Sequence, residues 1–161
     1  MAISQINSSS IASSGVAQTN LASNVVGNGP TFRANTTSNQ SIPSGTWTKV
    51  VCDTKEWDTN TNYSTANARF TPTVAGYYQL TGGFLLNTAT DVYATVYKNG
   101  SANSWFAIMT PATVRGAWGS CLVYANGTTD YFEMYAYLGA ARTLNGGADQ
   151  TYFSGALVRA A

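Results

Sequence analysis

Beyond residue 30, apolar and polar residues alternate in short runs that are separated by turn residues. This alternation predicts strands at residues 31–35, 46–52, 68–71, 77–86, 91–97, 104–109, 117–124, 130–138 and 152–159. A period of two is typical of a strand with one buried face. No stretch has the period and length of a helix, so about nine short strands predict a β-sandwich or a barrel.

Three Gly-containing pairs or triplets divide the strand runs. Asn99-Gly100 and Asn126-Gly127 each lie between two β-rich runs, and this pattern predicts a hairpin at both places. Asn145-Gly146-Gly147 is a third turn of this kind.

Residues 1–29 have a different pattern from the rest of the chain. They contain no charged side chain, and single apolar residues recur at a step of five: Ile6, Ile11, Val16, Leu21 and Val26. That step matches neither a helix nor a strand, so we predict an extended, non-helical arm with small apolar anchors. A flexible linker is the alternative. Gly27-Asn28-Gly29-Pro30 marks the boundary with a domain over 30–161.

The run at 130–138 is apolar or aromatic on both faces. One face carries Phe132, Met134, Ala136 and Leu138, and the other carries Tyr131, Glu133, Tyr135 and Tyr137. A sandwich strand normally has a polar outer face, so the three tyrosines are candidate contacts with another subunit. The alternative is a solvent-exposed tyrosine ladder that stabilises the sheet by cross-strand pairing. The sequence does not decide which face would self-associate.

Composition explains how such a chain stays polar with few charges. Apolar residues make up 44% of the chain and charged residues 9%, while Thr, Ser and Asn together supply 51 of the 161 residues. The net charge is +1 and the basic residues are scattered, which argues against nucleic acid or an anionic membrane as partner. We find neither an apolar run long enough for membrane insertion nor a secretory signal pattern.

Candidate chemistry is sparse. The chain has no His, which excludes Ser-His-Asp and Cys-His nucleophilic sites and the common zinc sites. It has no phosphate-cradling glycine motif, and we expect neither a cofactor nor a metal.

Three of the seven carboxylates, those of Asp53, Glu56 and Asp58, cluster at 53–58. A paired-acid glycosidase or a Ca²⁺ site would need them to converge, and a polar, solvated loop is the simpler interpretation. Trp57 lies among them as a possible glycan contact or a loop anchor. Cys52 and Cys121 are interpreted as free thiols in preference to a disulfide.

Four segments resemble the complement component 1q/tumour necrosis factor family, in the family's order. They are residues 68–86 (ARFTPTVAGYYQLTGGFLL), 91–100 (DVYATVYKNG), 121–138 and 151–158 (TYFSGALV). The resemblance implies a ten-strand jelly roll that forms a tight homotrimer and has no enzymatic activity. Two features depart from the family: the turn Gly127-Thr128-Thr129-Asp130 is longer, and no collagen-like stem is present. The arm resembles the Ser/Ala/Thr-rich repeats that precede such domains in bacteriophage fibre and decoration proteins.

The function expected from these features is structural. The first hypothesis is a homotrimeric capsid decoration protein, a cement or head-fibre protein on the virion surface, assembled in the host cytoplasm. Its arm would dock on the major capsid protein or on another virion protein. The alternative is the receptor-binding tip of a tail fibre, with Trp57 and Trp105 facing a host glycan. A depolymerase built on the acidic cluster and a secreted recognition domain are disfavoured.

Overall fold

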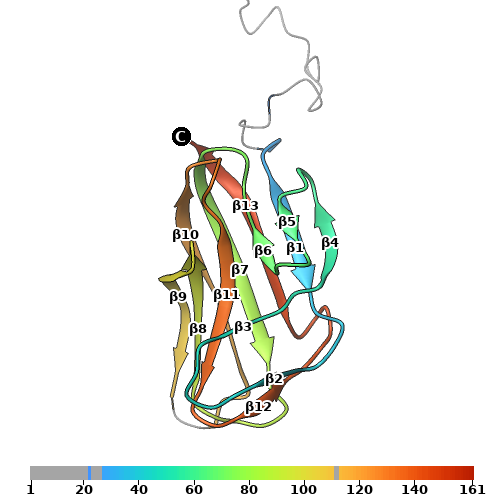
Figure 1. Cartoon of the computed structure of the whole chain (residues 1–161), viewed down its shortest axis with the longest axis vertical. Helices are drawn as coiled ribbons and strands as arrows, with labels where there is room; N and C mark the ends of the chain where they lie inside the picture. Colours follow the sequence, from blue (N-terminus) through green and yellow to red (C-terminus); the bar gives the residue numbers. More distant parts are fainter. Residues whose placement is uncertain (1–21, 23–26, 111–112) are drawn as a thin grey trace, which may run out of the picture.

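The regular structure in the computed structural model consists of β-strands, and residue 22 and residues 27–110 and 113–161 are described (Figure 1). Thirteen strands and no helix lie in these residues, so the all-β prediction is confirmed. Nothing in this part of the chain could cross a membrane as an apolar helix. The five arm anchors, Ile6, Ile11, Val16, Leu21 and Val26, lie outside the described residues.

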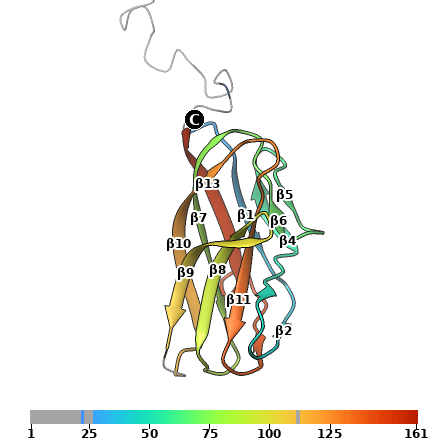
Figure 2. The ribbon, with the colours of Figure 1, turned by 60° about the vertical axis from the view of Figure 1, so that its left-hand side comes forward.

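Two sheets form the layers of a sandwich (Figures 1 and 2). The first sheet has the order β10 (Gly116–Ala125), β7 (Gly76–Leu85), β13 (Tyr152–Ala160), β1 (Thr31–Asn35) and β4 (Thr54–Asp58). The second has the order β5 (Tyr63–Ser64), β6 (Arg69–Phe70), β11 (Phe132–Leu138), β8 (Val92–Lys98) and β9 (Ser101–Met109). β3 (Thr48–Lys49) also pairs with β11, and β2 (Gln40–Ile42) pairs with β12 (Arg142–Leu144). All named strand pairs are antiparallel.

The resemblance implied ten strands, whereas the described residues contain thirteen. The two layers contribute five each along their main paths, and the additional strands are the short β2, β3 and β12. The short strands β2, β4, β5 and β12 were not predicted, and the expected strand at 46–52 is reduced to β3. Val50 and Cys52 are buried there and Val51 is exposed. The predicted alternation of buried and exposed residues is therefore present, although these three residues are not part of a strand.

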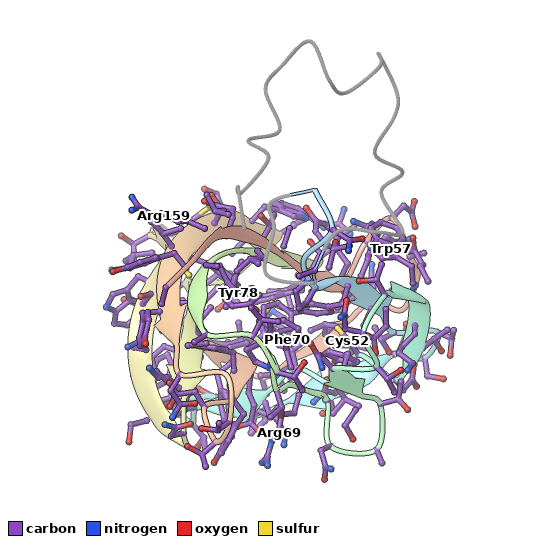
Figure 3. The ribbon with its side chains drawn as sticks, turned by 90° about the horizontal axis from the view of Figure 1, so that it is seen from above. Cys52, Trp57, Arg69, Phe70, Tyr78 and Arg159 are labelled. Carbon is purple, nitrogen blue, oxygen red and sulfur yellow. The ribbon has the colours of Figure 1, made fainter. Side chains whose placement is uncertain are left out.

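An aromatic stack fills the space between the sheets (Figure 3). Phe32 on β1 stacks on Phe70 of β6 and on Tyr63 of β5, with ring centroids 4.3 and 5.0 Å apart. Phe70 meets Tyr78 of β7 edge-on at 5.5 Å. These rings are almost completely buried, and a large aromatic side chain contributes several kcal/mol when removed from water. The stack therefore joins strands of both layers.

The two Asn-Gly turns have different roles. Asn99 and Gly100 both have positive φ, at 53° and 81°, and they join the paired strands β8 and β9, so this hairpin is confirmed. The hairpin predicted at Asn126-Gly127 is wrong, because β10 pairs with β7 while β11 pairs with β8. The Asn126 side-chain oxygen accepts hydrogen bonds from the backbone N–H groups of residues 128, 129 and 130. These bonds make the turn compact although the strands on either side of it do not pair.

The sheets meet along one edge of the sandwich, where β9 and β10 lie side by side (Figures 1 and 2). A Cβ at Gly119 of β10 would collide with the backbone carbonyl of Phe106 on β9. Glycine is required there by the close approach of the two backbones rather than by a special backbone conformation.

Asp130 ties the two Asn-Gly turns together. Its carboxylate accepts hydrogen bonds from the Asn99 side chain at 2.8 Å and from the Asn126 backbone at 2.9 Å, and it pairs with Lys98 at 2.8 Å. Burial acts to raise the pKa of Asp130, but these bonds outweigh it and leave the pKa below its usual value.

We expect Asp130→Asn to lower the free energy of unfolding by about 1–3 kcal/mol near neutral pH, because a charge-assisted network is lost. The folded-state pKa lies below the unfolded value of about 3.9. The stabilisation is therefore complete above the unfolded pKa and is lost as the pH falls through the folded pKa. Urea unfolding at about pH 7 and about pH 3 should show a difference from wild type that shrinks in acid.

The matched control is Asp149→Asn, because Asp149 is exposed and makes no side-chain hydrogen bond among the described residues. This variant should unfold like wild type at both pH values. An Asp130→Asn protein as stable as wild type at neutral pH would contradict the role of the network.

Candidate functional site

The acidic cluster is mainly an edge strand and not the expected solvated loop. Residues 54–58 form β4, which pairs only with β1 and leaves its other edge unpaired in the described structure. Strands at an edge need little apolar character and are commonly charged, which explains why the sequence pattern did not predict β4.

The three carboxylates of the cluster have separate structural partners. Asp53 accepts the backbone N–H of Thr37 at 3.3 Å. Glu56 accepts hydrogen bonds from the side chains of Arg33 and Asn35, both at 3.0 Å. The carboxylate of Asp58, only 3% exposed, accepts the backbone N–H groups of residues 62 and 63 and pairs with the Lys55 ammonium at 3.2 Å.

These bonds tie β4 to β1 and to the segments on either side of it. No group of three His, Cys, Asp or Glu side chains in the described part of the chain could hold a metal ion. A glycosidase needs two acids that face one substrate, whereas these three acids are engaged with separate partners within the chain.

Trp57 lies on the outer face of the first sheet, with 46% of its surface exposed (Figure 3). Its indole N–H is 3.4 Å from the Thr31 hydroxyl. It lines a shallow hollow of about 180 Å³ together with small polar side chains such as Thr81 and Ser154. Trp57 is thus accessible, and its role as a glycan contact stays a prediction.

Five exposed apolar side chains lie on the same sheet, on the three strands farthest from β4. This apolar face consists of Tyr77 on β7, Trp118, Leu122 and Tyr124 on β10, and Val158 on β13. Each of the five is between 43% and 57% exposed. Tyr77 and Tyr124 are register partners with ring centroids 5.5 Å apart. An exposed apolar group of this size on a sheet is typical of an interaction surface.

A hollow of about 530 Å³ opens within this apolar face. Tyr77, Leu122 and Val158 line it together with the last three residues of the chain, 159–161. The C-terminus and the start of β1 lie at this same end of the sandwich (Figure 1).

Tyr131, Tyr135 and Tyr137, the candidate trimer contacts, lie on the outer side of the second sheet and are half-buried. Their rings are engaged within the chain. The Arg69 guanidinium lies 3.7 Å from the ring centre of Tyr131, Tyr135 stacks on Tyr97 at 3.9 Å, and Tyr137 contacts Tyr93 at 5.5 Å. Their role in subunit contact stays a prediction.

Tyr135 and Tyr137 belong to a second aromatic surface. This surface, which we call the aromatic patch, consists of six residues: Trp47, Tyr93, Tyr97, Trp105, Tyr135 and Tyr137. Trp47 precedes β3 and lies at the centre, 5.4–6.1 Å from the rings of Tyr97, Trp105 and Tyr137. Trp105 is half exposed. The molecule therefore carries one aromatic or apolar surface on each sheet.

Sequence reasoning did not identify the apolar face or the central position of Trp47. The signal for the former was present in 117–124, where Trp118, Leu122 and Tyr124 alternate with Ala117 and other small or apolar residues. That strand is apolar on both sides, as is the strand at 130–138. Trp47 lies outside any long strand, so no periodicity could place it.

Comparisons with known proteins address the fold. No protein-family model matches the chain, and no curated protein matches it. Among solved structures, the globular domain of zebrafish complement 1qA has a TM-score of 0.61 at 14% identity, over 82% of this chain and 98% of that chain. Murine APRIL has a TM-score of 0.62 at 11% identity, over 80% and 98%. The chain has the complement 1q/tumour necrosis factor jelly-roll fold.

A vertex protein has a similar fold as well. The PRD1 vertex protein P5 matches with a TM-score of 0.52 at 17% identity, over 81% of this chain and 96% of that chain. The resemblance drawn from the four sequence segments is thereby confirmed at the level of the fold.

Both cysteines are free thiols, as predicted. Burial raises the pKa of Cys52 to about 12, and the Asp53 carboxylate acts in the same direction. Burial likewise raises the pKa of Cys121 to about 11, against a hydrogen bond with Ser104 that lowers it. A thiol that stays protonated near neutral pH is a poor nucleophile.

We expect a thiol-specific disulfide reagent at about pH 8 to modify native protein slowly, with Cys121 reacting before the more deeply buried Cys52. Both thiols should react fast in urea. Cys121→Ser should leave a single slow phase in the native protein. A native Cys52 that reacts as fast as the unfolded thiol would contradict its burial.

Proposed function

We propose that this protein is a homotrimeric structural protein of a bacteriophage virion, which decorates the capsid and displays its jelly roll. The apolar face of the first sheet carries the proposal. Residues Tyr77, Leu122 and Val158 expose apolar surface from three adjacent strands. When another copy of the same chain covers such a surface, each Å² of apolar area removed from water stabilises the complex by about 25 cal/mol.

The number of subunits comes from the jelly-roll resemblance, which implies a homotrimer. The apolar face suits that assembly because it extends to β10, the edge strand of the first sheet, where Leu122 and Tyr124 are exposed. A heterologous contact between this edge of one copy and the apolar face of the next gives a closed trimer when a threefold rotation relates the copies. We place the subunit contacts there in preference to the tyrosines of β11, whose rings are already packed.

Attachment to the particle is assigned to the arm. The described chain enters the sandwich at the end where the hollow of the apolar face opens (Figure 1). An uncharged arm with the anchors Ile6, Ile11, Val16, Leu21 and Val26 suits binding to the major capsid protein or another virion protein through backbone hydrogen bonds and small apolar contacts. The fold shared with the PRD1 vertex protein supports a place on the virion surface.

The second candidate function is the receptor-binding tip of a tail fibre that recognises a host surface glycan. The aromatic patch on the second sheet favours it, because that surface stays free if the first sheet forms the subunit contacts.

We expect Leu122→Asp to dissociate the oligomer, because a carboxylate buried in an apolar interface without a partner costs several kcal/mol. Light scattering after size exclusion should give three chain masses for wild type and one, 17.0 kDa, for the variant. Val51→Asp is the matched control, because Val51 is an exposed apolar residue outside the apolar face. A monomeric wild type, or a trimeric Leu122→Asp protein, would contradict the proposed interface.

We expect the full-length protein to remain on purified particles in about 1 M NaCl, because an uncharged arm gains little from screened electrostatic attraction. Val16→Asp with Leu21→Asp should release it, since each lost anchor removes about 1.5–3 kcal/mol. The measurement is the protein retained per particle, with electron microscopy to locate it. Release of wild type by salt alone would count against this mode of attachment.

A further inference from the structure

The aromatic patch presents several flat ring faces at the surface of the second sheet. Trp47 and Trp105 have ring centroids 5.5 Å apart and planes at 58°, so they present two aromatic faces at an angle. Tyr93 and Tyr97 extend the patch along β8 on either side of Thr95. Thr95, which pairs with Tyr135 and Trp105, is only 1% exposed, so the rings exclude water from the sheet beneath them.

The side-chain polar groups of the patch form no hydrogen bond within the described part of the chain. The hydroxyls of Tyr63 and Tyr78, in the core, donate to backbone carbonyls. The four tyrosine hydroxyls of the patch and its two indole N–H groups make no hydrogen bond with any described residue. No buried side-chain polar atom in this part of the chain lacks a partner, so these groups reach solvent. They form a rim of donors and acceptors around the ring faces.

Charge is absent from the patch itself. The nearest ionised group on β11 is the Glu133 carboxylate, which is 3% exposed and pairs with Lys49 at 3.1 Å and Arg69 at 3.0 Å. Arg69 points away from the core on the side opposite to Trp57 (Figure 3), and its guanidinium is held over Tyr131. Glu133 is shared by these two cations and neither of them belongs to the patch, whose six side chains are all uncharged.

We propose that the aromatic patch binds an uncharged glycan. A pyranose ring offers an apolar face of C–H groups with hydroxyls around its edge, and this matches indole and phenol faces with a rim of O–H and N–H groups. Trp105 is the stacking platform, Trp47 the second wall, and Tyr93 a hydrogen-bonding partner. The proposal rests on the proposed function only in that the first sheet, not this one, forms the subunit contacts.

The test is binding of the full-length protein to a panel of immobilised uncharged glycans: glucans, galactans, mannans and N-acetylhexosamine polymers. Wild type should bind at least one of them, and the binding should be the same in about 0.05 and 1 M NaCl because no ion pair contributes. Trp105→Ala should weaken it about tenfold or more, the size expected for losing an aromatic hot spot. Tyr93→Phe, which keeps the ring and removes the hydroxyl, should weaken it less.

Trp57→Ala is the matched control, since Trp57 is a similarly exposed tryptophan on the opposite sheet. It should bind like wild type. Absence of binding to every uncharged glycan would overturn the proposal, and so would loss of binding in Trp57→Ala with retention in Trp105→Ala. The mass of each variant in solution is measured in parallel. Trp105→Ala proteins that become monomeric would show that the patch is a subunit contact instead, whereas a monomeric wild type that still binds glycan would overturn only the trimer.

Discussion

The packing of Phe32 between the two sheets is the contact on which the rest of the sandwich depends. Its ring lies on Phe70 and Tyr63 from the second sheet and meets Phe153 of its own sheet edge-on at 5.2 Å. Because β1 lies between β13 and β4, this one ring fixes how the first sheet sits over β5 and β6. Gly155, opposite Phe32 in the ladder, leaves the space that the ring fills. The outer faces, and so the candidate surfaces, take their positions from this core.

The outer faces of the two sheets determine how the molecule binds its partners. Only 15 side chains are charged, and nine of these are paired with one another: Arg33, Lys49, Lys55, Glu56, Asp58, Arg69, Lys98, Asp130 and Glu133. Little free charge remains to steer a partner, so recognition depends on apolar area and neutral hydrogen bonds. The first sheet carries the apolar face and the second sheet carries the aromatic patch. We assign assembly to the first and glycan binding to the second.

Strand positions were largely predictable, and strand partners were not. Alternation located eight of the strands within a few residues, because period-two burial is a local property of the chain. It failed for β4, where an edge strand carries exposed charged side chains, and for the partners of β10 and β11, where an Asn-Gly turn crosses between sheets. The acidic residues looked like a possible site because Arg33 and Thr37, the partners of Glu56 and Asp53, are remote from them in sequence.

By itself, the sequence determined the all-β class, the jelly-roll resemblance, the neutral surface and the uncharged arm, since each follows from composition or from spacing along the chain. Only the tertiary structure decided which apolar side chains stay exposed. Phe132 and Tyr135 are both aromatic residues of one strand, yet one lies between the sheets and the other lies in the patch. The patch also needs Trp47, which reaches it from a segment far away in sequence from β8, β9 and β11. Burial and juxtaposition of this kind depend on how two sheets pack, and no local pattern contains that information.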